Sequence, residues 1–161
     1  MTPGSGEHFL YFAYGSNLDA ARLHRSCPGA RPCGRARLPA YRLRFPLYSR
    51  RWGGGVADVV PDPSAEVWGA LWRIAAGEAA ALDRQEGVDR DPPRYRRVEL
   101  SVETSVGGRL SCLAYRVAAP DPDAALAPSP DYLAAMLRGA RAFSLPEAYV
   151  ARLAALRPAP E

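Results

Sequence analysis

The residue best suited to acid–base chemistry is Glu86, which ends a segment whose pattern predicts a helix. Ala75, Ala79 and Leu82 precede it, and the spacing i, i+4, i+7, i+11 places its carboxylate on the apolar face. Burying an unpaired carboxylate is costly. Burial and the negative end of the helix dipole would both raise its pKa toward the range of a general base near neutral pH. The spacing is equally compatible with a side chain that turns to solvent at a frayed helix end.

The second candidate is the tetrapeptide Tyr14-Gly15-Ser16-Asn17, which joins a predicted aromatic strand to a predicted helix. Backbone N–H groups exposed by such a turn can bind a carboxylate or a developing oxyanion. A structural turn with an asparagine helix cap is compatible with the same residues. The tetrapeptide is not the G-x-S-x-G elbow of hydrolases, so Ser16 is not interpreted as a nucleophile.

Tyr132 and the residues that could bind a metal or a cofactor give weaker functional signals. Tyr132 stands at helical spacing with Met136, Gly139 and Phe143, which by itself indicates a core tyrosine. The chain has three cysteines without a C-x-x-C pair and only two histidines, so no metal site is expected. It has no lysine, which excludes a P-loop and a lysine Schiff base. We therefore expect no cofactor.

Composition narrows the class of protein. The 161 residues are 48% apolar and 24% charged, which predicts one domain over 1–161 with an ordered core of about 8–157. No window approaches the roughly 18 apolar residues of a spanning helix, and the polar N-terminus does not resemble a signal peptide. We expect a cytoplasmic protein without a membrane partner. The net charge of +4 comes from arginines spread along the chain, so we expect no nucleic-acid partner.

These candidates need elements that position them. The pattern predicts strands over residues 8–12, 34–38, 41–48, 56–60, 66–74, 94–103 and 110–117, with breaks at Pro39 and Pro46 and a turn at 61–64. It predicts helices after residue 17, over 75–86 before Gly87, from 129–130 to about 143, and from 146 to about 156. Six or seven short strands, linked mostly by hairpins, favour a mixed α/β (α+β) domain over a doubly wound sheet. The expected architecture is a small closed or partly closed β-barrel with surrounding helices.

Five segments together resemble the γ-glutamyl cyclotransferase family of the AIG2-like superfamily. They are residues 9–18 (FLYFAYGSNL), 52–54 (WGG), 66–69 (EVWG), 82–88 (LDRQEGV) and 128–132 (PSPDY). They occur in the family's order with similar gaps and cover nearly the whole chain. The resemblance implies a closed mixed barrel and an enzyme that needs no cofactor.

The resemblance also implies roles for individual residues. The family's catalytic glutamate falls on Glu86, and a substrate-contacting tyrosine falls on Tyr132 in place of the core interpretation. The substrate-binding run is Tyr11, Phe12, Ala13, Tyr14, Gly15 and Ser16, with Asn17 completing the motif. The Tyr-Gly-Ser-Asn form is similar to the branch that acts on γ-glutamyl amino acids.

The expected reaction converts a γ-glutamyl amino acid or amine to 5-oxoproline and the free amino acid or amine. The substrate's α-amine attacks its own γ-carbonyl, with Glu86 as general acid and base. Two alternatives stay open: a non-catalytic small-molecule binding module of the same fold, and a tailoring enzyme that removes a γ-glutamyl group from an antibiotic precursor. The expected partner is a small γ-glutamyl substrate, and the expected assembly is a monomer or homodimer.

Overall fold

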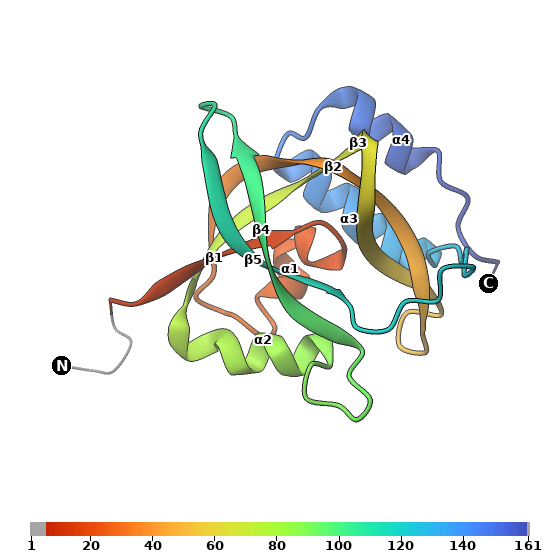
Figure 1. The fold of residues 1–161 in the computed structure, drawn as a ribbon, viewed down its shortest axis with the longest axis horizontal. Coiled ribbons are helices and arrows are strands. Elements are labelled where there is room, and N and C mark those ends of the chain that lie inside the picture. Colours follow the sequence, from red (N-terminus) through yellow and green to blue (C-terminus); the bar gives the residue numbers. More distant parts are fainter. Residues whose placement is uncertain (1–5, 161) are drawn as a thin grey trace.

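The computed structural model describes residues 6–160. Their strands form a closed barrel in the order β1-β3-β2-β4-β5 (Figure 1). The strands are β1 (His8–Ala13), β2 (Arg31–Ser49), β3 (Gly54–Ala75), β4 (Tyr95–Thr104) and β5 (Arg109–Val117). Every pairing is antiparallel except that of β1 with β5, which closes the barrel in parallel. The predicted mixed barrel is confirmed.

The strands are fewer and longer than predicted. The expected breaks at Pro39 and Pro46 and the expected turn at 61–64 were wrong, because β2 and β3 run through them as one long antiparallel pair. The register of this pair shifts between Pro39 and Tyr41 and again between Arg44 and Leu47. Proline cannot donate to a ladder but is tolerated at bulges. The prolines therefore bend these strands without ending them.

The helices follow the predicted order. They are η1 (Ser16–Leu18), α1 (Ala20–Leu23), η2 (Ala76–Glu78), α2 (Ala79–Glu86), α3 (Pro130–Ala142) and α4 (Glu147–Ala154). The helix predicted over 75–86 thus begins as a 3₁₀ turn, and Gly87 ends it in the left-handed conformation with φ 71°. Ser129 caps α3, accepting a hydrogen bond from the Tyr132 backbone N–H at 3.1 Å.

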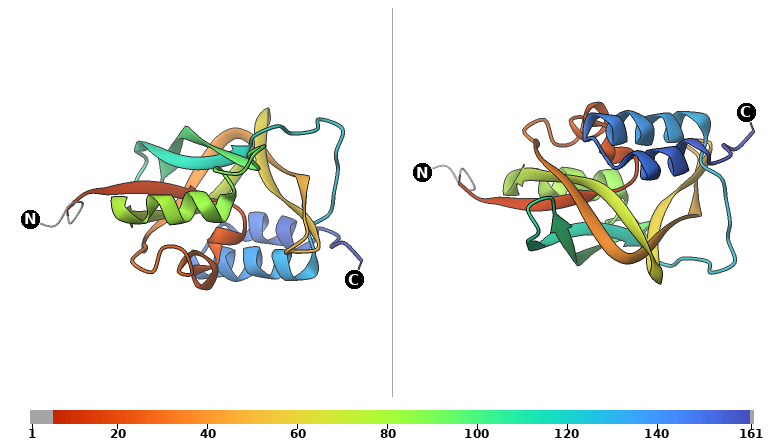
Figure 2. Two further views of the ribbon diagram at one scale, coloured as in Figure 1. Left: turned by 90° about the horizontal axis from the view of Figure 1, so that it is seen from below. Right: turned by 90° about the horizontal axis from the view of Figure 1, so that it is seen from above.

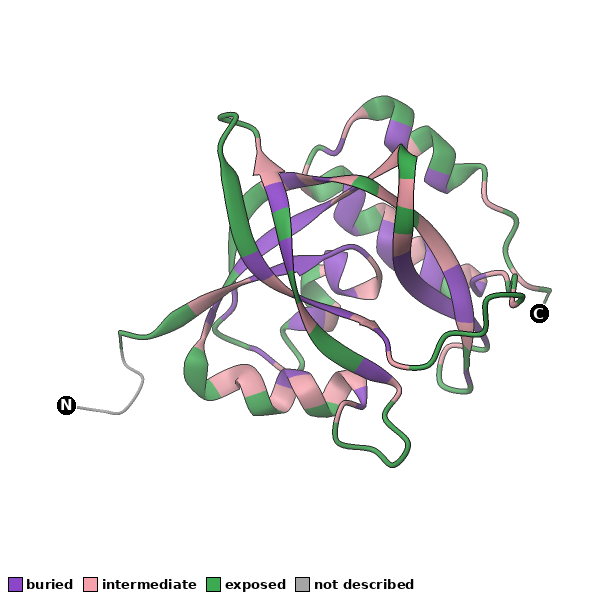
Figure 3. Ribbon diagram, in the orientation of Figure 1, coloured by how far each residue is buried: buried purple, intermediate pink, exposed green. Residues whose placement is uncertain are grey.

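The hydrophobic core fills the barrel and extends beneath α3, as the buried residues in Figure 3 show. α3 and α4 lie side by side in both views of Figure 2. α3 also packs against η1 at very close range, because a Cβ added to Gly139 would lie 2.2 Å from the Leu18 carbonyl. Glycine at this position therefore lets η1 pack directly against α3.

Two connections lie near each other at one end of the barrel: the β2–β3 turn and the loop between α2 and β4 (Figure 1). They are tied by a 3.0 Å hydrogen bond from Arg94 Nη2 to the Tyr48 carbonyl. The end of α2 lies beside them, so Glu86 is brought to a cleft bounded by both connections. No helix within residues 6–160 is long and apolar enough to cross a membrane.

Candidate active site

Glu86 and Asn17, which are 69 positions apart, meet in the structure. Asn17 Nδ2 donates to Glu86 Oε1 at 2.7 Å and lies 2.9 Å from the Tyr11 hydroxyl. Gln85 Nε2 donates in turn to Asn17 Oδ1 at 2.7 Å. Asn17 is therefore not the helix cap allowed by the sequence, since Asp19 accepts from the Ala21 N–H at the start of α1. Its buried amide orients the carboxylate.

The Glu86 carboxylate points inward and not to solvent at a frayed helix end. Burial raises its pKa to about 7, while nearby Arg22 and the hydrogen bond from Asn17 oppose the rise. The residue keeps partial exposure because it lines two cavities. A carboxyl group with this pKa exchanges protons readily near neutral pH, which suits a general acid and base.

The two cavities meet at Glu86. The inner chamber holds only about 30 Å³, comparable to one water molecule, and is walled largely by tyrosines. The outer cleft holds about 650 Å³, within the range of small-molecule sites. Both are lined by Ser16, Glu86, Tyr95 and Tyr132. A ligand in the cleft can thus place one small group in the chamber, beside the carboxylate.

Tyr132 reaches the junction of these cavities from α3. Its hydroxyl oxygen accepts a 3.0 Å hydrogen bond from the Ala57 N–H, and its ring meets Trp52 edge-on with centroids 5.1 Å apart. Burial raises its pKa to about 12, so the hydroxyl stays protonated and can donate to a ligand. A Cβ on Gly15 would lie 2.5 Å from this hydroxyl, so only glycine lets the turn approach it.

The turn itself presents backbone donors. Within residues 6–160, the backbone N–H groups of Gly15 and Asn17 donate no backbone hydrogen bond. A tight turn that leads into a helical segment commonly leaves such donors free. These two groups are available to a carboxylate or an oxyanion.

Most residues implied by the resemblance come together here, and two do not. Tyr11, Tyr14, Gly15, Ser16, Asn17 and Tyr132 surround the chamber with Glu86. Phe12 and Ala13 line neither cavity and belong to the hydrophobic core, with 0% and 1% of their surface exposed. Since side chains alternate along a strand, a contiguous run cannot point entirely at one site.

A second carboxylate near Glu86 has the opposite electrostatic environment. Asp83 lies one turn earlier on α2, forms a two-pronged ion pair with Arg97 and accepts from the Tyr115 hydroxyl at 2.7 Å. Burial by itself would raise the pKa of Asp83, but the hydrogen bonds from Arg97 and Tyr115 lower it below its usual value. Asp83 therefore stays charged and braces the helix. The two neighbouring carboxyl groups therefore have pKa values driven in opposite directions.

Several residues of this site were not found from the sequence. Tyr95 on β4 and Tyr115 on β5 wall the chamber, and the Tyr95 hydroxyl donates to the Ala57 carbonyl at 2.5 Å. Arg22 on α1 lines the cleft. Tyr95 pairs with Val117 and Tyr115 pairs with Arg97, near the ends of β4 and β5, but only barrel closure places both tyrosines around the chamber. Among residues 6–160, no group of three histidine, cysteine or acidic side chains is placed to hold a metal.

Known proteins match this chain over nearly its whole length. The model of the AIG2-like family matches residues 66–153. A gamma-glutamylcyclotransferase from Mus musculus is 38% identical over 157 residues, 95% of this chain and 81% of that protein. The Homo sapiens gamma-glutamylcyclotransferase is 36% identical over 162 residues, 98% of this chain and 84% of that protein. A solved gamma-glutamyl cyclotransferase structure superimposes with a TM-score of 0.89 at 34% identity, covering 96% and 91% of the two chains. With such similarity in sequence and in fold, the chain belongs to the γ-glutamylcyclotransferase/AIG2-like family.

Proposed function

We propose that this chain is a γ-glutamylcyclotransferase that converts a γ-glutamyl amino acid or amine to 5-oxoproline and the free amino acid or amine. The observation that carries the proposal is the Glu86 carboxyl group, held by Asn17 at the junction of the two cavities with a pKa of about 7. The names of the relatives support the same reaction.

The proposed chemistry needs one group that both takes and gives a proton. The substrate's α-amine has an ordinary pKa near 8 and is mostly protonated at neutral pH. Glu86 accepts its proton, and the free amine attacks the γ-carbonyl to close a five-membered ring. Glu86 then delivers that proton to the departing nitrogen as the old C–N bond breaks. The second proton, which the ring nitrogen carries after the attack, passes through Glu86 to the released amine, which leaves as an ammonium group. A carboxyl group with a pKa of about 7 is well matched to both steps.

The remaining residues fold the substrate and stabilise charge. The nucleophile and the electrophile belong to one substrate molecule, so much of the rate acceleration comes from holding the glutamyl part of the substrate in a bent conformation. We assign the free N–H groups of Gly15 and Asn17 to the substrate's α-carboxylate or to the oxyanion of the tetrahedral intermediate. Tyr132 would contact the glutamyl part from the junction. The leaving group would extend into the outer cleft, because the inner chamber is too small for it.

The test is release of 5-oxoproline from γ-glutamyl dipeptides by the wild type and by Glu86→Gln. Gln keeps an oxygen that can accept from Asn17 but cannot transfer the proton, so we expect turnover to fall by roughly 10²- to 10⁴-fold. Glu147→Gln, an exposed position on α4, is the matched control and should retain wild-type turnover. Near-wild-type turnover by a folded Glu86→Gln would contradict the role of Glu86. Binding of dipeptides by the wild type without any 5-oxoproline release would identify a binding module instead.

A further inference from the structure

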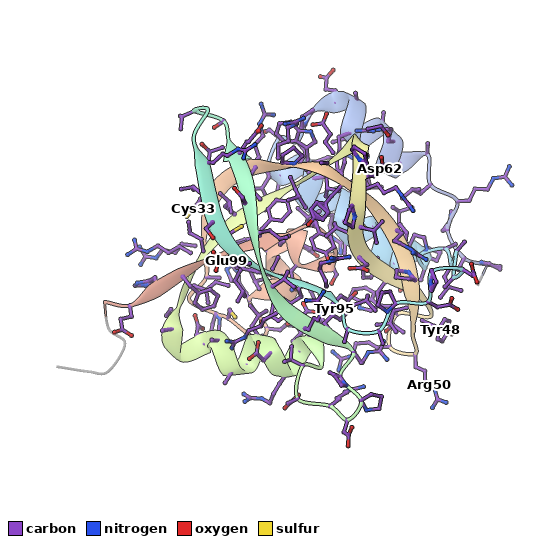
Figure 4. All side chains as sticks on the ribbon, viewed as in Figure 1. Cys33, Tyr48, Arg50, Asp62, Tyr95 and Glu99 are labelled. Atoms are coloured by element: carbon purple, nitrogen blue, oxygen red, sulfur yellow. The ribbon has the colours of Figure 1, made fainter. Side chains whose placement is uncertain are left out.

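The outer cleft gathers arginines from four separate segments of the chain. They come from α1, the β2–β3 turn, α2 and the α2–β4 loop: Arg22, Arg50, Arg51, Arg84, Arg90 and Arg94. Glu86 is the one acidic residue among the described residues that line this cleft. Figure 4 labels Arg50 and Tyr48 at the β2–β3 turn and Tyr95 further inside the molecule. The wall that faces the catalytic carboxyl group is therefore strongly cationic.

These arginines are not consumed by ion pairs. Within residues 6–160, none of the ion pairs involves any of the six. Arg50, Arg51, Arg84 and Arg90 are exposed, and Arg94 is anchored through one nitrogen to the Tyr48 carbonyl. Like charges gathered in a cleft repel one another, and a bound anion relieves that repulsion.

Arg22 gives the most direct indication of a missing partner. Its guanidinium lies 5.6 Å from the centre of the Trp52 ring, which also contacts Tyr132. Its Nε is shielded from solvent and has no hydrogen-bond partner among the described residues. Burial lowers the pKa of Arg22 and nearby Arg51 lowers it further, while the charge of Glu86 opposes the change. A buried donor without an acceptor is rare in folded proteins, and a ligand carboxylate would satisfy it.

We propose that the outer cleft selects an anionic leaving group, so that the preferred substrates are γ-glutamyl derivatives of acidic amino acids. The inference rests on the proposed function, because it assigns the outer cleft to the part of the substrate that departs. The α-carboxylate and the side-chain carboxylate of such a leaving group provide two anions for the arginines. A leaving group with a cationic side chain, such as lysine in γ-Glu-Lys, or a cationic aminoglycoside is repelled by the same wall.

Three substrates of similar length test the charge preference: γ-Glu-Glu, γ-Glu-Gln and γ-Glu-Lys. We expect kcat/KM for 5-oxoproline release to be roughly tenfold higher for γ-Glu-Glu than for γ-Glu-Gln, and lowest for γ-Glu-Lys. The preference should shrink as salt is raised, because exposed charges are screened. Equal values for γ-Glu-Glu and γ-Glu-Gln would overturn the inference while leaving the proposed function intact.

Variants that remove single charges test whether the arginines of the cleft cause the preference for γ-Glu-Glu. Arg51→Gln and Arg90→Gln should each lower the γ-Glu-Glu to γ-Glu-Gln ratio several-fold, mainly through KM for γ-Glu-Glu. Arg141→Gln removes the same charge from an exposed position on α3 outside the cleft, and its ratio should equal that of the wild type. An equal drop in all three variants would refute the assignment to the cleft, because it would reflect net charge alone.

Binding to Glu86→Gln separates this inference from the proposed reaction. Calorimetric Kd values for γ-Glu-Glu and γ-Glu-Gln do not depend on turnover, and we expect roughly tenfold tighter binding of γ-Glu-Glu. If the wild type releases no 5-oxoproline from any substrate, the proposed function fails, and this ratio of Kd values still decides the charge preference. Equal Kd values would overturn the preference whatever the turnover.

Discussion

The raised pKa of Glu86 has a consequence for stability that can be measured without any substrate. The folded protein holds this carboxyl group at a pKa of about 7, compared with 4.5 for an unperturbed glutamate. The charged form is therefore disfavoured by folding, and its cost appears as pH rises from about 4.5 to about 7. Replacing Glu86 with Gln removes the ionisation and hence this cost.

The sign and the size of the effect follow from linkage. At low pH the group is protonated in both states, so wild type and Glu86→Gln should have similar free energies of unfolding. Above about pH 7 the variant should be the more stable protein. Each tenfold change in proton affinity corresponds to about 1.4 kcal/mol, so the upper limit of the difference is about 3.5 kcal/mol. Gln preserves an acceptor for the hydrogen bond from Asn17, which keeps the comparison close to a pure charge effect.

The assay is urea unfolding of both proteins at several pH values between 4 and 8.5. The difference in free energy of unfolding should be near zero at pH 4 and should grow through pH 6 and 7. Glu147→Gln, with its exposed side chain, provides the matched control and should follow the wild type at every pH. Two parallel curves for wild type and Glu86→Gln, or a variant that loses stability as pH rises, would refute the electrostatic reasoning about this site.

Two further substitutions test the parts that hold Glu86 in place. Asn17→Leu removes a hydrogen bond that lowers the pKa of Glu86. The acidic limb of the profile of kcat/KM against pH should therefore move to higher pH by about one pH unit or more. An acidic limb at the same or a lower pH would contradict this reasoning. Gly139→Ala places a Cβ 2.2 Å from the Leu18 carbonyl and should lower the free energy of unfolding by about 1–3 kcal/mol. Gly77→Ala, where a Cβ meets nothing within 4 Å, is its control, and equal effects of the two would contradict the packing argument.

Local patterns in the sequence were sufficient for much of the barrel. The strands predicted over 8–12, 94–103 and 110–117 correspond to β1, β4 and β5, and Ser129 marked the start of α3. Helical spacing placed Glu86 on an inward face, and its side chain does point inward. These features depend on residues within a few positions of each other, so the sequence alone carries them.

The continuity of the long strands could not be judged in the same way. Prolines at 39, 46 and 61 are local signals for breaks, yet β2 and β3 pass through them. Whether a proline ends a strand depends on whether its partner strand can absorb the missing hydrogen bond in a bulge. That is a property of the pair and not of either segment.

The chemistry of the site was decided almost entirely by tertiary contacts. The sequence placed Glu86 on the apolar face of a predicted helix and a Gly-Ser-Asn turn after a strand. It left a solvent-facing glutamate and an asparagine helix cap as alternatives. Only the closed barrel brings Asn17 within 2.7 Å of Glu86 and surrounds the pair with tyrosines from other strands. The burial that raises the pKa of Glu86 depends on these tyrosines, which are far from Glu86 in the sequence.

The arginines show the same division most clearly. Along the sequence they are spread out and carry no pattern, so they indicated only a basic composition. The fold draws six of them from four segments around one cleft that ends at Glu86. Charge acts through space over distances of a few ångströms, and sequence separation does not record those distances. The sequence thus determined a glutamate on an apolar helix face and a turn after the first strand, because both are local patterns. The tertiary structure alone decided that the two meet and that the cleft beside them is cationic.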